Sequence, residues 1–361
     1  MRILALDIGG LTQDILLFDS TQTMENCVKM IMPSPTSILA QKIRAVTRAR
    51  RAVFFSGVNA GGGPSKRALA EHLKAGLEAY ATPEAATTFD DDLEEVARWG
   101  VSIVPEDKAP EGKEVERIET KDLDLAAVEK ALKAFNVEAR LDAIAVAVLD
   151  HGVAPPGMSD RRFRFHCLRQ VAEKRKGLIA FAYLAEEIPP HLTRMKAVVQ
   201  RLDRDLPLLL LDTPVAAAIG AGEDREVARH SHRVMVNVGN FHTLAFHCHQ
   251  DVIMGFFEHH TRFLDREKMD NLILKLVRGE LTNEEVYNDD GHGCLIIEKS
   301  SEVPFVTVTG PQRNLMVGSK LKPYFAVPYG DMMLTGCFGL VRAFARRVEI
   351  WREEIEKALD H

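Results

Sequence analysis

The feature that most constrains this chain is a glycine turn that joins two apolar segments near its first residue. Ile3 to Leu6 leads into the sequence DIGGLTQD at 7–14, and Ile15 to Phe18 follows at once. The runs of Ile and Leu on both sides predict buried strands, so the turn should close a β-hairpin. Because no helix follows the glycines, the context argues against a Walker loop or a dinucleotide-binding βαβ unit.

The residues of this turn suit a phosphate group and a cation. Gly9 and Gly10 let backbone N–H groups approach phosphate oxygens, and Thr12 adds a hydroxyl donor. Asp7 can hold a hydrated Mg²⁺, so we expect it to act as the metal-orienting and catalytic carboxylate. The turn therefore predicts a nucleotide site.

A second segment repeats this plan past the middle of the chain. RVMVNVGNFHTLAF at 233–246 reads as strand, polar residue, glycine, short turn with a threonine, and strand again. Two hairpins of one design predict two similar lobes, whose turns face each other across a cleft and grip a phosphate chain. The residues expected to bind the nucleotide here are Asn237, Gly239, Asn240, His242 and Thr243.

Apolar runs and helical periodicity alternate along the chain, which predicts an α/β protein with mixed sheets flanked by helices. We expect strands at 2–6, 15–19, 52–56, 101–104, 143–149, 178–182, 207–211, 233–238, 243–247, 252–257 and 304–309. The expected helices are 36–49, 66–79, 83–99, 125–135, 160–175, 190–204, 264–278 and 338–358. The charged segment 105–122 lacks periodicity and predicts a surface loop, and the arginines of helix 160–175 predict a solvated face.

Length and composition limit the class of protein. A chain of 361 residues exceeds one ordinary core, so we expect an N-terminal lobe at 1–230, with an inserted substrate region, and a C-terminal lobe at 231–361. A net charge of -6 does not favour nucleic acid as a partner. No apolar run approaches the roughly 20 residues of a membrane span, so we expect a cytoplasmic protein that does not bind membranes.

Three further segments complete a pattern of five. A strand enters a helix of small residues at 207–221, a strand ends in a glycine turn at Gly310, and Gly336 opens the last helix. The order resembles the signature of the sugar kinase, heat-shock chaperone and actin superfamily, and DIGGLTQD is similar to the DIGGTxTD of hydantoinase-type members. The matching segments are phosphate-1 at 7–14, connect-1 at 213–221, phosphate-2 at 237–243, adenosine at 307–314 and connect-2 at 335–344.

This resemblance implies two ribonuclease-H-like lobes, as in actin-like ATPases, with ATP and Mg²⁺ in a central cleft. Gly310 and Gly336 would then border the adenosine. Phosphate-2 of the superfamily begins with an aspartate, whereas this chain has Asn237, which accepts hydrogen bonds but carries no charge. The substitution leaves open whether ATP is hydrolysed or only bound.

Within the superfamily the chain resembles a group described as "pyruvate formate-lyase activating enzyme-like". The resembling stretches include GGGP at 61–64, DHG at 150–152, EHHT at 258–261 and GHG at 291–293. A radical activase of the S-adenosylmethionine type needs clustered cysteines for its iron–sulfur cluster. The five cysteines here are scattered, so we do not expect that activity.

Other polar residues follow strand ends, where open α/β sheets place chemistry. Asp150 and Glu258 are candidate general bases, with His151 as an orienting partner of Asp150, although Asp150 can equally cap a turn. Eight histidines crowd the second half and allow a transition-metal site, with plain hydrogen bonding as the alternative. They are His230, His232, His242, His247, His249, His259, His260 and His292.

Three functions remain open at this stage. The first is an ATP-dependent kinase or ATPase with an unknown small-molecule or protein acceptor. The second is an ATP-dependent regulator or activator with little turnover, and the third is a metal-dependent hydrolase that uses the histidine-rich C-terminal lobe. The sequence does not decide the oligomeric state.

Overall fold

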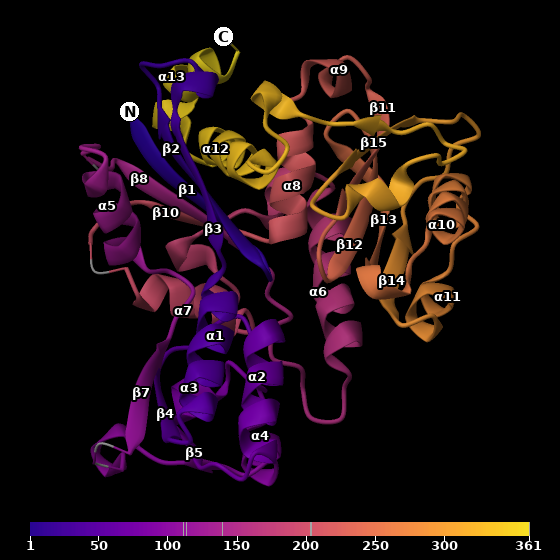
Figure 1. The fold of residues 1–361 in the computed structure, drawn as a ribbon. Helices are drawn as coiled ribbons and strands as arrows, with labels where there is room; N and C mark the ends of the chain where they lie inside the picture. Colours follow the sequence, from indigo (N-terminus) through magenta and orange to yellow (C-terminus); the bar gives the residue numbers. More distant parts are fainter. Residues whose placement is uncertain (111, 113, 139, 203, 361) are drawn as a thin grey trace.

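The structure, a computed structural model, describes residues 1–361 except 111, 113, 139, 203 and 361. Two large mixed sheets stand on either side of a central pair of helices, and a smaller sheet extends below the first (Figure 1). The first large sheet has the order β3-β2-β1-β8-β10-β9. Its strands are β1 (Arg2–Ile8), β2 (Thr12–Asp19), β3 (Val28–Pro33), β8 (Ala143–Val148), β9 (Tyr183–Leu184) and β10 (Leu208–Leu211).

The second large sheet has the order β14-β13-β12-β11-β15-β16. Its strands are β11 (His232–Val238), β12 (His242–His249), β13 (Val252–His260), β14 (Gly291–Ile296), β15 (Phe305–Thr309) and β16 (Tyr324–Phe325). In both sheets the first strand pairs antiparallel with the second, and the second with the third. On its other side the first strand begins a parallel run, β1-β8-β10 or β11-β15-β16.

The two sheets are thus built on one plan, with an antiparallel meander beside parallel strands. This is the ribonuclease-H-like arrangement that the resemblance implied, and the expected fold class of an α/β protein with two mixed-sheet lobes is confirmed. The hairpin β1-β2 corresponds to the hairpin β11-β12. Successive residues of the central strands point to opposite faces of the sheet, and nearly all of them are buried. This is expected where helices cover a sheet on both sides.

The smaller sheet lies between β3 and β8 in the sequence and has the order β6-β5-β4-β7, with all neighbours parallel. Its strands are β4 (Ala52–Gly57), β5 (Ala79–Ala81), β6 (Val101–Ile103) and β7 (Val115–Thr120). Figure 1 shows it at the lower left with its helices α1 (Pro35–Arg48), α2 (Gly63–Lys74), α3 (Pro83–Ala86) and α4 (Leu93–Arg98). It forms the floor of the pocket described below.

The remaining helices cover the two large sheets. They are α5 (Leu125–Ala134), α6 (Asp160–Arg175), α7 (Thr193–Gln200), α8 (Thr213–Ala221), α9 (Arg225–Ala228), α10 (Arg266–Arg278), α11 (Asn283–Asn288), α12 (Thr335–Arg347) and α13 (Glu349–Leu359). Among the described residues, no helix combines the length and the apolar character needed to span a membrane.

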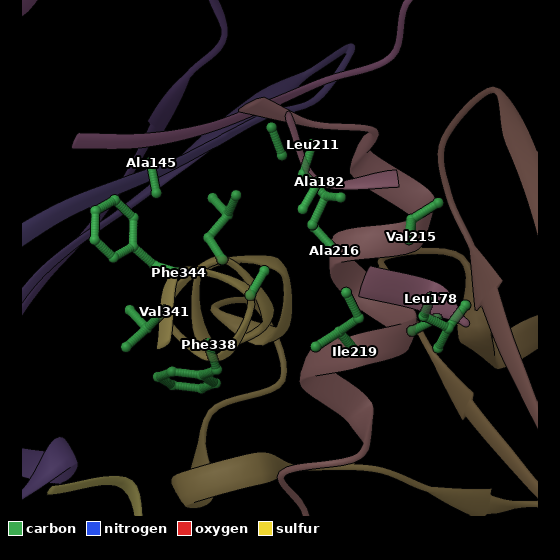
Figure 2. Packing of buried hydrophobic residues seen from close by; sticks show 14 of the residues in the cluster. Ala145, Leu178, Ala182, Leu211, Val215, Ala216, Ile219, Phe338, Val341 and Phe344 are labelled. Carbon is green, nitrogen blue, oxygen red and sulfur yellow. The ribbon is translucent and has the colours of Figure 1, made fainter. Parts of the chain in front are cut away.

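Helices α8 and α12 cross in close contact at the centre of the molecule (Figure 2). A Cβ built on Gly220 would lie 1.7 Å from the carbonyl oxygen of Thr335, and one on Gly339 would lie 1.9 Å from that of Ala216. Only glycine fits at these two positions, because any side chain would push the helices apart. Around the crossing, Phe338 and Phe344 of α12 pack in one apolar cluster with residues of α8, β8 and β10.

Several local predictions were wrong. Residues 178–181 form a 3₁₀ helix instead of a strand, and the predicted helix 83–99 is two short helices. The predicted loop 105–122 contains β7, whose residues Val115–Thr120 complete the parallel small sheet beside β4. The division into lobes at residue 230 stays a prediction; α12, from the end of the chain, packs against both α8 and β1.

Candidate functional site

The turns of the two corresponding hairpins have the same hydrogen bond. The N–H of Gly9 donates to the carbonyl oxygen of Thr12 at 2.9 Å, and the N–H of Gly239 donates to that of His242 at 3.0 Å. These two glycine amides are therefore engaged within their turns. In the described part of the chain, the N–H groups at the tips, 10–11 and 240–241, have no backbone acceptor, which leaves them available to an anion.

The two tips touch each other. A Cβ built on Gly10 would lie 2.2 Å from Cε2 of Phe241, so the aromatic ring of the second turn rests against the bare backbone of the first. The same ring lies 3.7 Å from a Cβ built on Gly63, at the start of α2. Turns that are more than 200 residues apart in the sequence thus meet at one place, beside the small sheet.

The tips open into a pocket of about 870 Å³ where the three sheets meet. The small sheet and its helices contribute residues 59–64, Lys66 and 87–91 to the lining. The predicted site residues that line this pocket are Asp7, Gly9, Gly10, Thr12, Asp150, His151, Asn237, Gly239, Asn240, His242, Gly310 and Gly336.

Two predicted residues, Thr243 and Glu258, lie behind the wall of the pocket and are fully buried. The hydroxyl of Thr243 is 2.9 Å from that of Thr261, which in turn donates to the carbonyl oxygen of Gly239. Thr243 therefore stabilises the second turn through Thr261 and does not line the pocket itself.

Two buried carboxylates stand side by side under the first turn. Asp7 and Asp14 pair across the hairpin, and each is only 7% exposed. Burial raises the pKa of Asp7 to about 7, and burial together with the neighbouring Asp7 charge raises that of Asp14 to about 8. One oxygen of each carboxylate has no hydrogen-bond partner in the protein. Because buried acceptors without partners are unfavourable, a pair of them fits a hydrated cation.

Glycines at the other edge of the pocket allow close backbone approach. A Cβ on Gly336 would lie 1.9 Å from Oδ2 of Asp7, so the first turn of α12 presses directly on this carboxylate. Gly310 has a φ of +100°, and a Cβ there would lie 2.7 Å from Oδ1 of Asn237. Both glycines are therefore required by geometry in the region predicted to border the adenosine.

A buried arginine connects the two large sheets behind the pocket. Arg164 of α6 donates from Nε to both oxygens of Glu258 at 2.9 Å and forms two bonds to Asp212, the residue before α8. Its Nη1 also donates to the carbonyl oxygen of Asp150 at 2.8 Å. Although burial opposes the charge, Asp212 and Glu258 raise the pKa of Arg164 above its ordinary value.

The contact with Arg164 determines whether the side chain of Glu258 is ionised. Burial would favour the neutral acid, but the Arg164 guanidinium holds the pKa of Glu258 well below its ordinary value. Its Oε1 lies 3.1 Å from Nδ1 of His242. A carboxylate held by an arginine is a weak base, so this geometry favours a role in orienting His242 over the predicted role as a general base.

Asp150 is held by two backbone amides. Its Oδ1 accepts from Gly152 and its Oδ2 accepts from Met195, both at 2.9 Å. Burial raises its pKa, while these two hydrogen bonds act in the opposite direction. The turn-capping alternative is therefore present in the structure, and a catalytic role of Asp150 stays a prediction.

The structure brings six histidines together in two groups. His232 and His247 contact each other at the far end of the β11-β12 hairpin, with their Nε2 atoms 2.8 Å apart. His242, His260 and His292 gather instead at the pocket end, where His151 joins them from the loop after β8. His292 is 1% exposed, and burial lowers its pKa to about 2.

Sequence reasoning missed Arg164 and Asp14. Arg164 lies four and eight residues before the buried Leu168 and Ala172, so it shares their helix face, and that spacing marks it as a core position. Asp14 lies two and four residues before the buried Leu16 and Phe18, so it shares their face of β2, and it directly opposes Asp7 in the register. Both signals are present in the sequence, but each requires knowing which face of the element is buried.

The fold and site define a two-lobed α/β protein with a deep pocket between paired glycine turns. The chain belongs to the family described as "Putative pyruvate format-lyase activating enzyme (DUF1786)", which matches residues 60–315. The resemblance to this group is thereby confirmed at the level of the family. No curated protein matches the chain in sequence.

Several solved structures are similar to this chain over most of its length. The activator of the 2-hydroxyisocaproyl-CoA dehydratase from Clostridium difficile, with bound ADPNP, is 11% identical, with 98% of each chain covered and a TM-score of 0.37. The ethanolamine utilization protein EutJ from Carboxydothermus hydrogenoformans is 13% identical, with 94% of this chain and 89% of that chain covered and a TM-score of 0.34.

The inorganic polyphosphate/ATP-glucomannokinase from Arthrobacter sp. strain KM is 12% identical, with 100% of this chain and 99% of that chain covered and a TM-score of 0.33. Similarity at this level carries no inference about activity, which must come from the site.

Proposed function

We propose that this protein is a Mg²⁺-dependent ATP-binding phosphotransferase or ATPase. One observation carries the proposal: two turns of matching geometry meet at Gly10 and Phe241, with unengaged amides at their tips and two buried carboxylates beside them. Amides at 10–11 and 240–241 would donate to phosphate oxygens from both sides. Such donors stabilise the charge that develops on a transferring phosphoryl group.

The carboxylates of Asp7 and Asp14 would hold the cation through its water ligands, since each has an oxygen without a protein partner. When bound, Mg²⁺ would neutralise charge on the phosphates. Gly310 and Gly336, which line the pocket, would border the adenosine.

The acceptor would enter from the side of the small sheet, which contributes Lys66 and residues 59–64 to the pocket lining. Lys66 already pairs with Asp90 at 2.9 Å, so this region carries fixed charges of both signs. Asp150 is our candidate for the group that accepts the acceptor's proton, because burial raises its pKa toward the range of a general base.

A regulator with little turnover is the second candidate, and Asn237 favours it. Asn237 lines the pocket where the superfamily has an aspartate, and it carries no charge. Asp7 and Asp14 would therefore hold the cation without a carboxylate from the second turn, which favours binding of ATP with slow turnover. Release of phosphate from ATP, measured with and without candidate acceptors, separates the two functions. Tight binding without release would support the regulator.

The nucleotide site is tested by substituting Asp7→Asn and measuring the thermal stabilisation that ATP with Mg²⁺ gives. The amide keeps the shape but cannot attract the cation, so the stabilisation should be lost. Because ionised Asp7 is itself unfavourable in the apo protein, the variant should fold at least as well as the wild type. Asp251→Asn is the control, since the side chain of Asp251 is 90% exposed. Undiminished stabilisation of Asp7→Asn would show that Asp7 does not serve the nucleotide.

A further inference from the structure

A cluster of imidazoles lies where the two large sheets meet, beside the proposed nucleotide site. His151 follows β8 of the first sheet, whereas His242 begins β12 and His292 lies in β14 of the second. One ring nitrogen of each approaches the others, and the three atoms lie within 4.8 Å of one another. Three imidazoles from two sheets thus converge on a single point.

His292 is the residue that makes this arrangement unusual. It is 1% exposed, and neither of its ring nitrogens has a hydrogen-bond partner in the protein. Buried polar groups are almost always satisfied, so an imidazole with two unpartnered nitrogens points to a missing ligand. The neighbouring glycines hold it in place: a Cβ on Gly291 would lie 2.5 Å from Val286, and one on Gly293 would lie 2.5 Å from Phe165.

Glu258 orients the ring of His242 so that its other nitrogen can bind a ligand. Its Nδ1 lies 3.1 Å from Oε1 of Glu258, and Arg164 keeps that carboxylate ionised by binding both of its oxygens. The proton therefore belongs on Nδ1, and the lone pair of Nε2 is free for a ligand bond. A carboxylate behind a ligating histidine is the usual support of metal sites in proteins.

We propose that His151, His242 and His292 form a binding site for a divalent transition metal ion of the Zn²⁺ type. Imidazole nitrogen suits Zn²⁺, and three histidines with one open position form a site that also accepts water or a substrate oxygen. His151 and His242 also line the pocket of about 870 Å³, so the open position faces the space proposed for the nucleotide and acceptor.

A fourth imidazole, that of His260, lies beside the cluster. Its ring centroid is 4.7 Å from that of His292, and its Nδ1 donates to the carbonyl oxygen of Asp290 at 2.7 Å, which leaves Nε2 unprotonated. His259 differs, because strand alternation directs it to the opposite face, where Nε2 lies 3.1 Å from Asp289.

Metal binding would draw the two sheets together. Zn–N bonds of about 2.0–2.1 Å in a tetrahedron place the nitrogens roughly 3.3 Å apart. The three nitrogens lie within 4.8 Å of one another in the structure, so the rings or the lobes would have to approach by up to about 1.5 Å. Because His151 belongs to one sheet and the other two ligands to the other, the ion would couple lobe closure to the acceptor side of the pocket.

The test uses tag-free full-length protein, stripped with a chelator and titrated with Co²⁺ without nucleotide, followed by visible absorption and by competition with Zn²⁺. We expect about one ion per chain and the absorption bands of a four-coordinate Co²⁺ site. His292→Leu should lower the affinity by about 100-fold or more, since it removes a ligand. His166→Ala is the control, because His166 is exposed on α6.

The variant is designed to remain folded. Leu replaces an imidazole that has no partner, so the thermal stability of His292→Leu without metal should equal or exceed that of the wild type. His151→Ala, at a half-buried position on the other lobe, provides a second variant and should lose Co²⁺ as well. Asp7→Asn should bind Co²⁺ like the wild type, so failure of the nucleotide site leaves this test intact.

Absence of Co²⁺ and Zn²⁺ binding by the wild type would overturn the proposal. So would Co²⁺ affinity that is unchanged in both His292→Leu and His151→Ala, because the ion would then lie elsewhere.

Discussion

The contact between the two turns gives the sharpest prediction, through the substitution Gly10→Ala. Gly10 does not have a positive φ, so the backbone itself accepts alanine. The new methyl group would, however, lie 2.2 Å from Cε2 and 2.4 Å from Cδ2 of Phe241. Ordinary contacts begin at 3.4 Å, so the ring or the whole second turn must retreat by about 1.2 Å.

Overpacking of this size costs about 1–3 kcal/mol. If the two turns must meet to hold the triphosphate, this free energy is lost from binding, and the affinity for ATP with Mg²⁺ should fall about 5- to 150-fold. Isothermal titration calorimetry measures the affinity directly. Gly63→Ala is a matched control, because its Cβ would meet the same ring at 3.7 Å, an ordinary distance.

A double-mutant cycle separates the clash from other effects of Gly10→Ala. Phe241→Ala removes the ring, so Gly10→Ala should weaken binding much less in that background than in the wild type. Wild-type affinity in Gly10→Ala, or an equal loss in both backgrounds, would refute the claim that the turns act on the nucleotide as a closed pair.

Three other substitutions or conditions have clear outcomes. Arg164→Met leaves Glu258 and Asp212 buried without a counter-charge, so it should lower the free energy of unfolding by about 3–5 kcal/mol in urea titrations. Arg169→Met, at an exposed ion pair on the same helix, should change this free energy by less than about 1 kcal/mol, and equal losses would contradict the role of Arg164. Burial raises the pKa of Asp7 to about 7 and of Asp14 to about 8, so the folded state retains protons that the unfolded state has released above pH 3.8. Without Mg²⁺, the stability that these protonated groups contribute should decline as the pH rises above 3.8 and should be lost by pH 7 to 8, and Asp7→Asn should show a smaller decline; identical pH profiles of melting temperature would exclude the shift at Asp7. Gly336→Ala would place a methyl group 1.9 Å from Oδ2 of Asp7 and should weaken Mg²⁺-dependent ATP binding while leaving the unfolding free energy within about 3 kcal/mol of the wild type; unchanged binding in calorimetry would show that α12 does not position Asp7.

The sequence predicted the central hairpins well because their signal is local. A glycine turn between two apolar runs defines both strands and their antiparallel pairing, and the register of β1 with β2 follows from the short turn. The repeat of the plan at 233–246 was enough to predict the second sheet and a shared pocket.

Short edge strands were missed because their burial is decided by tertiary contacts. Val115–Thr120 carries three charged residues and reads as a loop, yet β7 lies at an edge of the small sheet, where one face meets solvent. The strand β14 contains Gly291 and Gly293, which lower strand propensity, but their small size is what allows the chain to pack against α6 and α11.

The polar constellation could be predicted only in part. Charged residues in a helix are usually solvated, so the arginines of helix 160–175 were predicted to face solvent. That prediction was wrong for Arg164, which is buried between Glu258 and Asp212. Likewise, sequence spacing could not divide the histidines, because His151 and His292 come together through the packing of two sheets. Such contacts depend on the fold as a whole.

The central claim is that both turns hold one triphosphate, and the most direct test is a crystal structure of the protein with Mg²⁺ and a non-hydrolysable ATP analogue. The account predicts phosphate oxygens within hydrogen-bond distance of the amides at 10–11 and at 240–241 in the same molecule, with the cation's water ligands on Asp7. A triphosphate bound by only one turn, or bound outside the pocket between them, would contradict it.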